Sequence, residues 1–121
     1  MNTPPLIRLT ATHIRDRLDM LRASGTVRLD RDETEALSAS LDGLSAESVD
    51  LFGSRTDPGS RGGDIDLLVL TAAPALQAAR QVATRFFARC EEKVDVVVID
   101  PTLMTPAQQA FIDSLRRVRI A

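Results

Sequence analysis

Three aspartates have the chemical type and the spacing of a metal site. Asp64 and Asp66 are separated by one residue at the start of an apolar run, and Asp95 lies near the start of a later one. Because side chains alternate along a strand, the Asp64 and Asp66 carboxylates point to one side and Ile65 points to the other. Three close carboxylates repel one another and need cations to stay ionised. Carboxylate oxygens suit Mg²⁺, with Mn²⁺ as the alternative, so we predict a divalent-metal site at these three aspartates.

A glycine-rich loop precedes the first two acids. Gly53, Ser54 and Arg55 follow an apolar stretch, and further glycines stand at positions 59, 62 and 63. Backbone N–H groups and a hydroxyl in such a loop can bind phosphate, and the forked guanidinium of arginine suits the same group. The loop lacks the Gly-Lys-Ser/Thr ending of a Walker A motif. Together with the acids it predicts a metal–nucleoside triphosphate site, with Gly53, Ser54 and Arg55 binding the nucleotide and Arg61 as a weaker candidate.

Each of these features also has a plainer interpretation. The acids could be solvated residues at strand starts, the loop a flexible surface hairpin, and both loop arginines solvated cations. The arginines at 116, 117 and 119 are interpreted as an exposed basic segment, with contact to RNA or to a partner as the alternative.

The hydrophobic pattern predicts an α+β (mixed α/β) fold, with a small mixed sheet of three or four strands flanked by helices. The expected order is ααββαβα, with an optional edge strand at the end. In the helix over 75–90, the apolar stripe is expected at Leu76, Ala79, Ala83, Phe86, Phe87 and Cys90. In the last helix, it is expected at Ala107, Ala110, Phe111, Ser114 and Leu115. The helices are expected at 12–23, 30–44, 75–90 and 105–115, and the strands at 48–52, 64–70, 93–99 and 117–120.

The connection between two of these strands brings the three acids together. A strand, a helix and a second strand in sequence form a right-handed crossover, which makes strands 64–70 and 93–99 parallel. Parallel strands start at the same end of a sheet, so Asp95 should lie near Asp64 and Asp66. If strand 48–52 runs antiparallel to strand 64–70, its end at Gly53 arrives at the same edge.

Length and composition favour an ordinary soluble domain. We expect 121 residues to form a single domain, with core motifs at 48–99 and N-terminal helices at about 12–44. The formal net charge of −2 offers no general attraction to nucleic acid, so direct nucleic-acid binding is not expected. The one cysteine, Cys90, excludes an intrachain disulfide, and no apolar run is long enough to span a bilayer. We therefore predict a cytoplasmic protein with no membrane contact; its four phenylalanines are expected to be buried, and a homo-oligomer stays open.

The ordered motifs resemble those of a known family. Gly53-Ser54-Arg55, then Asp64-Ile-Asp66-Leu-Leu-Val69, then Val94-Asp95-Val-Val-Val98 is similar to the minimal nucleotidyltransferases of the DNA polymerase β superfamily. The resemblance covers about residues 48–99 and implies a palm-like nucleotidyltransferase fold. It implies that Gly53 and Ser54 hold the β- and γ-phosphates, and that Asp64 and Asp66 bind two Mg²⁺ ions. Asp95 would bind the catalytic ion and help activate the attacking hydroxyl.

The resemblance also implies an activity and a partner. Transfer of a nucleoside monophosphate is expected, with ATP as the donor and AMP as the group moved. Small members of this family are often paired with a toxin of the HEPN type and act as antitoxins, some by AMPylation of a toxin tyrosine. This chain has no tyrosine, so it could not modify itself on that residue. A binding module that only occludes its partner is the first alternative, and transfer to a small molecule of the aminoglycoside type is the second. Family members commonly have serine where this chain has Gly63.

Overall fold

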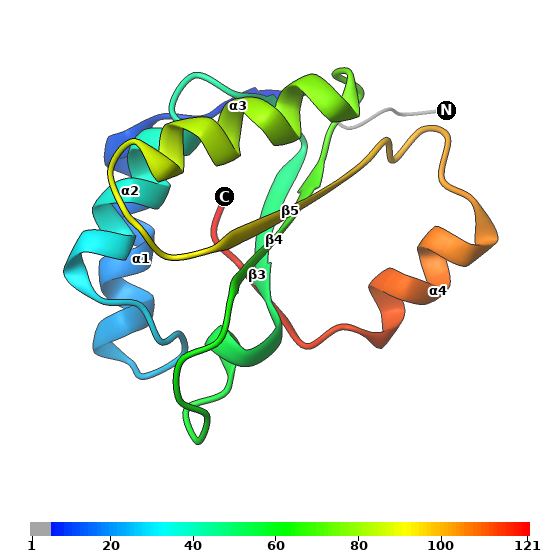
Figure 1. Ribbon diagram of the computed structural model, residues 1–121. Coiled ribbons are helices and arrows are strands. Elements are labelled where there is room, and N and C mark those ends of the chain that lie inside the picture. The colour runs from blue at the N-terminus through cyan, green and yellow to red at the C-terminus, as the bar shows by residue number, and fades with distance from the viewer. Residues whose placement is uncertain (1–5) are drawn as a thin grey trace.

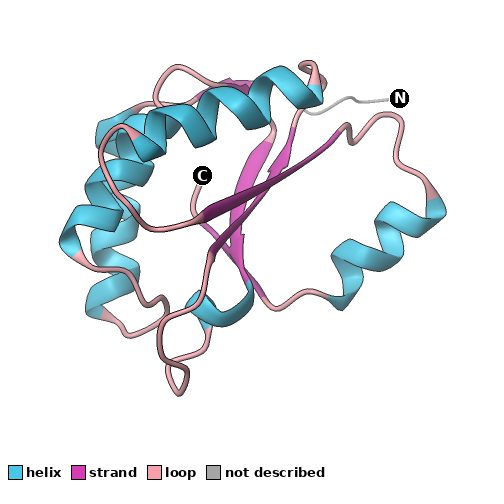
Figure 2. Cartoon of the chain, in the orientation of Figure 1, coloured by secondary structure: helices cyan, strands magenta, loops and turns pink. Residues whose placement is uncertain are grey.

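The computed structural model describes residues 6–121, which form four α-helices, one 3₁₀ turn and six strands. This is the expected α+β class, and the order of the main elements is as predicted (Figures 1 and 2). Two short strands were not anticipated, and they pair antiparallel to join the N-terminal segment to the end of the second helix. The elements are β1 (Ile7–Arg8), α1 (Ala11–Ala23), α2 (Arg31–Leu41), β2 (Ser45–Ala46), β3 (Ser48–Phe52), η1 (Gly53–Thr56), β4 (Ile65–Leu70), α3 (Ala75–Phe87), β5 (Val94–Ile99), α4 (Pro106–Ser114) and β6 (Arg117–Arg119).

The main sheet has the strand order β5-β4-β3-β6. Strands β4 and β5 are parallel, as the crossover through α3 predicted, with Ile65 opposite Val94 and Leu70 opposite Ile99. Strand β3 runs antiparallel to β4, and the expected C-terminal edge strand β6 runs antiparallel to β3. The start of β4, the start of β5 and the end of β3 therefore lie together at one end of the sheet, which carries Asp64, Asp66 and Asp95 and is the acid edge.

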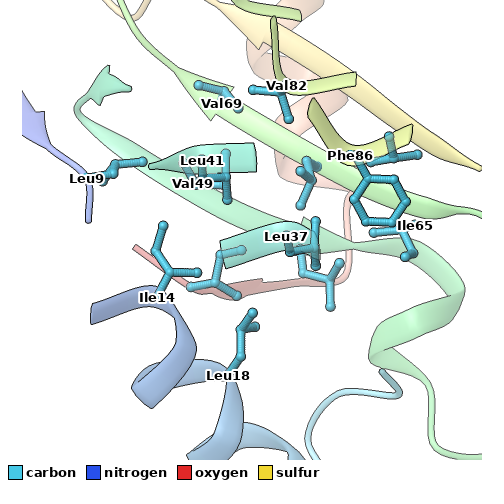
Figure 3. Close-up of a cluster of buried hydrophobic side chains, with 14 of the residues drawn as sticks. Leu9, Ile14, Leu18, Leu37, Leu41, Val49, Ile65, Val69, Val82 and Phe86 are labelled. Carbon is cyan, nitrogen blue, oxygen red and sulfur yellow. The ribbon is translucent and has the colours of Figure 1, made fainter. Parts of the chain in front are cut away.

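Helices α1, α2 and α3 cover one face of this sheet (Figure 1). Alternate residues of β4, namely Ile65, Leu67 and Val69, point into this main core. Phe86 of α3 and Leu37 of α2 pack against them, as Figure 3 shows. The continuous apolar sequence of β4 is explained by its position, since it lies between β3 and β5 and is covered on both faces.

Among the described residues, α4 is the one helix that covers the opposite face (Figure 1). Ile112 of this helix packs on Leu68 and Ile99, and a few half-buried side chains complete this smaller cluster. The residues of β4 and β5 that point to this side near the strand starts are Asp66 and Asp95, which are both half-buried. The acid-bearing end of the sheet is thus on the more open face.

The starts of α2 and α4 are explained by local capping residues. At α2, the Asp30 side chain accepts a hydrogen bond from the Glu33 N–H, and the Glu33 side chain accepts one from the Asp30 N–H. The same reciprocal capping box joins Thr105 and Gln108 at α4. These signals are local, so they need no tertiary information.

Two predicted apolar stripes were wrong in part, although Phe86, Ala83 and Cys90 of the first do pack in or against the main core. The inward-facing residues of α3 are Ala78, Val82 and Phe86, whereas Leu76 is 65% exposed and Phe87 is 55% exposed. At about 100° per residue, both exposed side chains point a third of a turn or more away from Val82 at the centre of the buried stripe. The prediction that every phenylalanine is buried fails for the same reason.

In α4, only Ile112 is buried, while Ala107, Ala110, Phe111 and Ser114 are exposed and Leu115, the C-cap, is half-buried. This helix rests on the sheet by a narrow contact, so most of its circumference is solvated.

Candidate functional site

The sheet brings the three predicted acids to one edge. Asp66 and Asp95 stand directly opposite each other on the parallel strands β4 and β5. Asp64 comes two residues before Asp66 and points to the same face. On the other side of Asp66, the paired residue is Phe52, the last residue of β3 before Gly53. The convergence expected from the topology is therefore present at the level of strand register.

A lysine lies among these acids. The Lys93 ammonium is 3.4 Å from Asp64 Oδ2 and 3.9 Å from Asp95 Oδ1. Its hydrogen bond to Asp64, together with the charges of Asp64 and Asp95, raises the pKa of Lys93 above its ordinary value. The chain thus supplies one positive charge of its own to the carboxylates.

The surroundings of Asp66 disfavour the ionised form of its carboxyl group. Burial raises its pKa, the charges of Asp95 and Asp64 raise it further, and Lys93 partly offsets them. A group whose ionised form is disfavoured by burial and by like charges gains from any added cation. The electrostatics of Asp66 therefore suit a cation-binding role.

The donor chemistry fits a hard divalent cation, but the side chains are not gathered around one point. Among residues 6–121, no three histidine, cysteine, aspartate or glutamate side chains form a group that could hold a metal ion. Mutual repulsion keeps ionised carboxylates apart, and here the Lys93 ammonium lies between two of them. Asp64, Asp66 and Asp95 would hold the ion, and metal binding by them stays a prediction.

Gly53 and Ser54 form the first half of the one-turn helix η1, which follows β3 directly. Gly53 has a φ of +78°, and a Cβ built on it would stand 2.7 Å from Asp66 Oδ2. A side chain here would therefore displace the carboxylate, and the left-handed φ also favours glycine. The Gly53 N–H donates to the Arg116 carbonyl at 3.2 Å, so this donor already has a partner in the chain.

Gly63, at the far end of the loop, lies against Ser54. Its φ is +86°, and a Cβ added to it would overlap the Ser54 hydroxyl. The serine expected from the family resemblance would clash here unless Ser54 moved. Glycine at position 63 lets the two ends of the loop close on each other, which brings the Ser54 hydroxyl beside the residue preceding Asp64.

Arg55 is not a solvated cation, and that interpretation was wrong. Its side chain is 7% exposed and forms a two-pronged pair with Glu33, at 2.9 Å from Nη1 to Oε1 and 2.8 Å from Nη2 to Oε2. It also donates to the Gly63 carbonyl and the Arg28 carbonyl. These contacts give Arg55 a role in holding the loop, while its predicted contact with nucleotide stays a prediction.

Arg28, in the segment between α1 and α2, was not singled out from the sequence. Its guanidinium donates to the carbonyls of Ser54 at 3.0 Å, Asp57 at 2.9 Å and Gly62 at 2.9 Å. The Arg28 side chain therefore binds backbone carbonyls from both the beginning and the end of the loop. The loop is a closed and cross-linked unit, while Arg61 at its tip is exposed.

The basic segment near the C-terminus is also more ordered than expected. Arg117 and Arg119 of β6 both pair with Asp50 of β3, whose side chain is 3% exposed. The separation is 2.9 Å between Arg117 Nη1 and Asp50 Oδ2. Two of the three arginines thus neutralise a buried acid, which explains why an aspartate is tolerated in the middle of a sheet strand.

Three functional candidates were missed from the sequence, and only one had a usable signal. Lys93 lies two residues before Asp95, so strand alternation places both on one face. Glu33 lies in the first turn of α2, and no local pattern indicates that it pairs with Arg55. No local pattern indicates that Arg28 binds a loop more than 25 residues away.

A scan against models of protein families finds no match for this chain, and a search of curated proteins finds no similar sequence. Within residues 6–121, each helix is too short or too polar to cross a membrane. The site itself is therefore what indicates a function for this chain.

Proposed function

We propose that this protein is a Mg²⁺-dependent nucleotidyltransferase that moves a nucleoside monophosphate, AMP from ATP, onto a hydroxyl group. The observation that carries the proposal is the register of three strands at one sheet edge. Asp66 is opposite Asp95 on one side and Phe52 on the other, so the acids and the Gly53–Ser54 turn are direct neighbours. The motif order that resembles minimal nucleotidyltransferases supports the same conclusion.

In this reaction the acceptor oxygen forms a bond to the α-phosphorus, and the bond from that phosphorus to the bridging oxygen breaks. Pyrophosphate leaves with the electron pair, and the hydroxyl proton passes to a carboxylate, for which Asp95 is our candidate. Two divalent ions, when bound, would neutralise the leaving group and the attacking oxygen. Asp64 and Asp66 would hold those ions, and the Ser54 hydroxyl lies beside Gly63, the residue that precedes Asp64.

We propose a partner protein of the HEPN toxin type as the source of the acceptor hydroxyl. Neutralisation of that partner would make the protein an antitoxin. A second function, occlusion of the partner without catalysis, is favoured by specific contacts. The Gly53 N–H is engaged by Arg116, and the Lys93 ammonium is already among the acids. Both contacts must be exchanged before a nucleotide and its metal can bind.

The test is calorimetry of ATP binding with and without Mg²⁺. We expect Mg²⁺-dependent binding to the wild type and its loss in the double variant Asp64→Asn/Asp66→Asn, because the ligands that hold the metal are removed. Asp16→Asn, an exposed aspartate on α1, is the matched control and should bind as the wild type does.

If the wild type binds neither ATP nor any of the other three nucleoside triphosphates, the transferase proposal for the free chain is wrong. Partner neutralisation separates the two functions. It should be lost in the double variant under the catalytic proposal and retained under occlusion.

A further inference from the structure

A hollow with a volume of about 530 Å³ lies between the end of α2 and the second half of α3, away from the acids. Its lining contains one acidic side chain, Asp42, and is otherwise basic or small. Three arginines and three small residues contribute to it, namely Arg8, Arg85 and Arg89 with Ala39, Gly43 and Ala88. The small residues leave room in the hollow, and the arginines make it basic.

The guanidinium groups of Arg8 and Arg85 both lie close to Asp42 and Gly43, which follow α2. Arg85 Nη1 donates to the Asp42 carbonyl at 2.7 Å. Arg8 Nη2 lies 3.9 Å from the position that a Cβ on the next residue, Gly43, would occupy. Arg89 lies in the turn that follows α3, four residues after Arg85, and both side chains line the hollow. The three side chains therefore converge without being neighbours in sequence.

The charges of these arginines are not balanced inside the described chain. Within residues 6–121, Arg8, Arg85 and Arg89 form no ion pair with a carboxylate, in contrast to the paired Arg55, Arg117 and Arg119. The nearby Asp42 carboxylate accepts a hydrogen bond from the Ala11 N–H at 2.9 Å and so caps α1. Three like charges around one hollow raise each other's energy, and an anion between them relieves it.

The negative end of α2 accounts for only part of this arrangement. The carbonyl of Asp42 at that helix end attracts a cation, and Arg85 satisfies it. This contact explains the position of Arg85. It does not explain why Arg8 from β1 and Arg89 from the turn after α3 line the same hollow.

We propose that this hollow is an anion site that binds a ligand carrying two or more phosphate groups. Guanidinium groups match phosphate oxygens by paired, charge-assisted hydrogen bonds, and a ligand with two or more phosphate groups offers enough charged oxygens for three arginines, which a single halide or carboxylate does not. A volume of about 530 Å³ is ample for more than one phosphate and falls in the usual range of ligand sites. The site is independent of the proposed transferase function, since it shares no residue with the acid edge.

The test is calorimetry with inorganic pyrophosphate in metal-free buffer containing a chelator. Under these conditions the acids at 64, 66 and 95 repel anions, so binding there is suppressed. We expect saturable binding to the wild type that weakens at least about tenfold in Arg89→Gln and in Arg8→Gln, because each removes a charge-assisted contact. Arg85→Gln should weaken it as well, but that variant also loses the bond to the Asp42 carbonyl. Arg80→Gln, an exposed arginine of the same helix outside the hollow, is the matched control.

Several outcomes would overturn the proposal. One is the absence of saturable pyrophosphate binding to the wild type, and another is an equal loss in Arg80→Gln, which would indicate general surface charge. Equal binding of a poly-glutamate peptide, with the same loss in Arg89→Gln, would replace the phosphate ligand by an acidic protein segment. The variant Asp64→Asn/Asp66→Asn should bind pyrophosphate as the wild type does; stronger binding in this variant, from which two repelling charges are removed, would place the ligand at the acid edge.

Discussion

At the scale of single residues, the folded protein disfavours the ionised form of Asp66. It is half-buried, faces Asp95 across the strands and has Gly53 packed against its carboxylate. Its pKa is raised above the ordinary value of 3.8 by burial first and by the two neighbouring aspartates next. Above this raised pKa the side chain is ionised in both the folded and the unfolded protein, and the folded protein bears the penalty. Functional sites commonly retain such a penalty at the expense of stability.

We therefore expect Asp66→Asn to raise the thermal unfolding midpoint at pH 7 in metal-free buffer. The gain should shrink as the pH falls through the raised folded pKa of Asp66 towards 3.8, since the wild-type side chain then becomes neutral in both states. Thermal unfolding of the wild type and of Asp66→Asn at several pH values from about 7 down to 3.8 measures the effect. The exposed-aspartate variant Asp16→Asn should show no such pH-dependent gain. An unchanged midpoint at pH 7, or a gain that grows towards acid pH, would contradict this account of Asp66.

At the scale of elements, the loop between β3 and β4 is fastened to α2 by one buried ion pair. Glu33 lies in the first turn of α2 and Arg55 lies in η1, and their side chains are 4% and 7% exposed. The same Glu33 also accepts the Asp30 N–H in the capping box. The start of a helix and the conformation of the glycine-rich loop therefore depend on one carboxylate.

Glu33→Gln should lower the free energy of unfolding by about 3 kcal/mol, because it leaves the buried Arg55 charge with only the longer pair to the exposed Glu92, at 3.8 Å. Glutamine can still serve the capping box, so the loss reports the ion pair. Urea unfolding measures the stability, and the rate of tryptic cleavage after the exposed Arg61 measures the opening of the loop. Glu35→Gln is the matched control, since its pair with Arg15 is exposed and should contribute less than about 1 kcal/mol. Equal losses in the two variants, with unchanged cleavage, would show that the loop does not depend on Glu33.

At the scale of the whole molecule, the last residues of the chain belong to the main core. Ile120 is fully buried with residues of α1, β3 and β4, and its N–H donates to the Val49 carbonyl at 2.9 Å. The preceding strand β6 is held by the pairs from Arg117 and Arg119 to Asp50. The C-terminal segment thus helps to close the sheet edge beside β3.

Ile120→Ala should reduce stability by roughly 2–5 kcal/mol, because it leaves a cavity in the main core. Phe87→Ala removes a larger side chain that is 55% exposed, and it should change stability by no more than about 0.5 kcal/mol. Chemical unfolding of both variants makes the comparison. A larger loss in Phe87→Ala would mean that this face of α3 is covered in solution.

Local signals were enough to predict most of the elements. The capping residues Asp30 and Thr105 mark helix starts, and alternation defines the strands around Val49 and Asp66, because both signals act over a few residues. The rotation of α3 was not predictable, because Leu76 and Phe87 are as apolar as the residues that are buried. The pairing of β1 with β2 was missed because two-residue strands have no period to recognise.

By itself, the sequence determined the class of fold, the parallel relation of β4 and β5, and the edge at which Asp64, Asp66 and Asp95 meet. These follow from chain connectivity and from the period of strands, which are properties of the order of residues. Only the tertiary structure decided that Arg55 is buried on Glu33, that Lys93 lies among the acids, and that distant arginines converge on one hollow. Such contacts join residues far apart in the chain, and they depend on side-chain packing in three dimensions rather than on any local pattern.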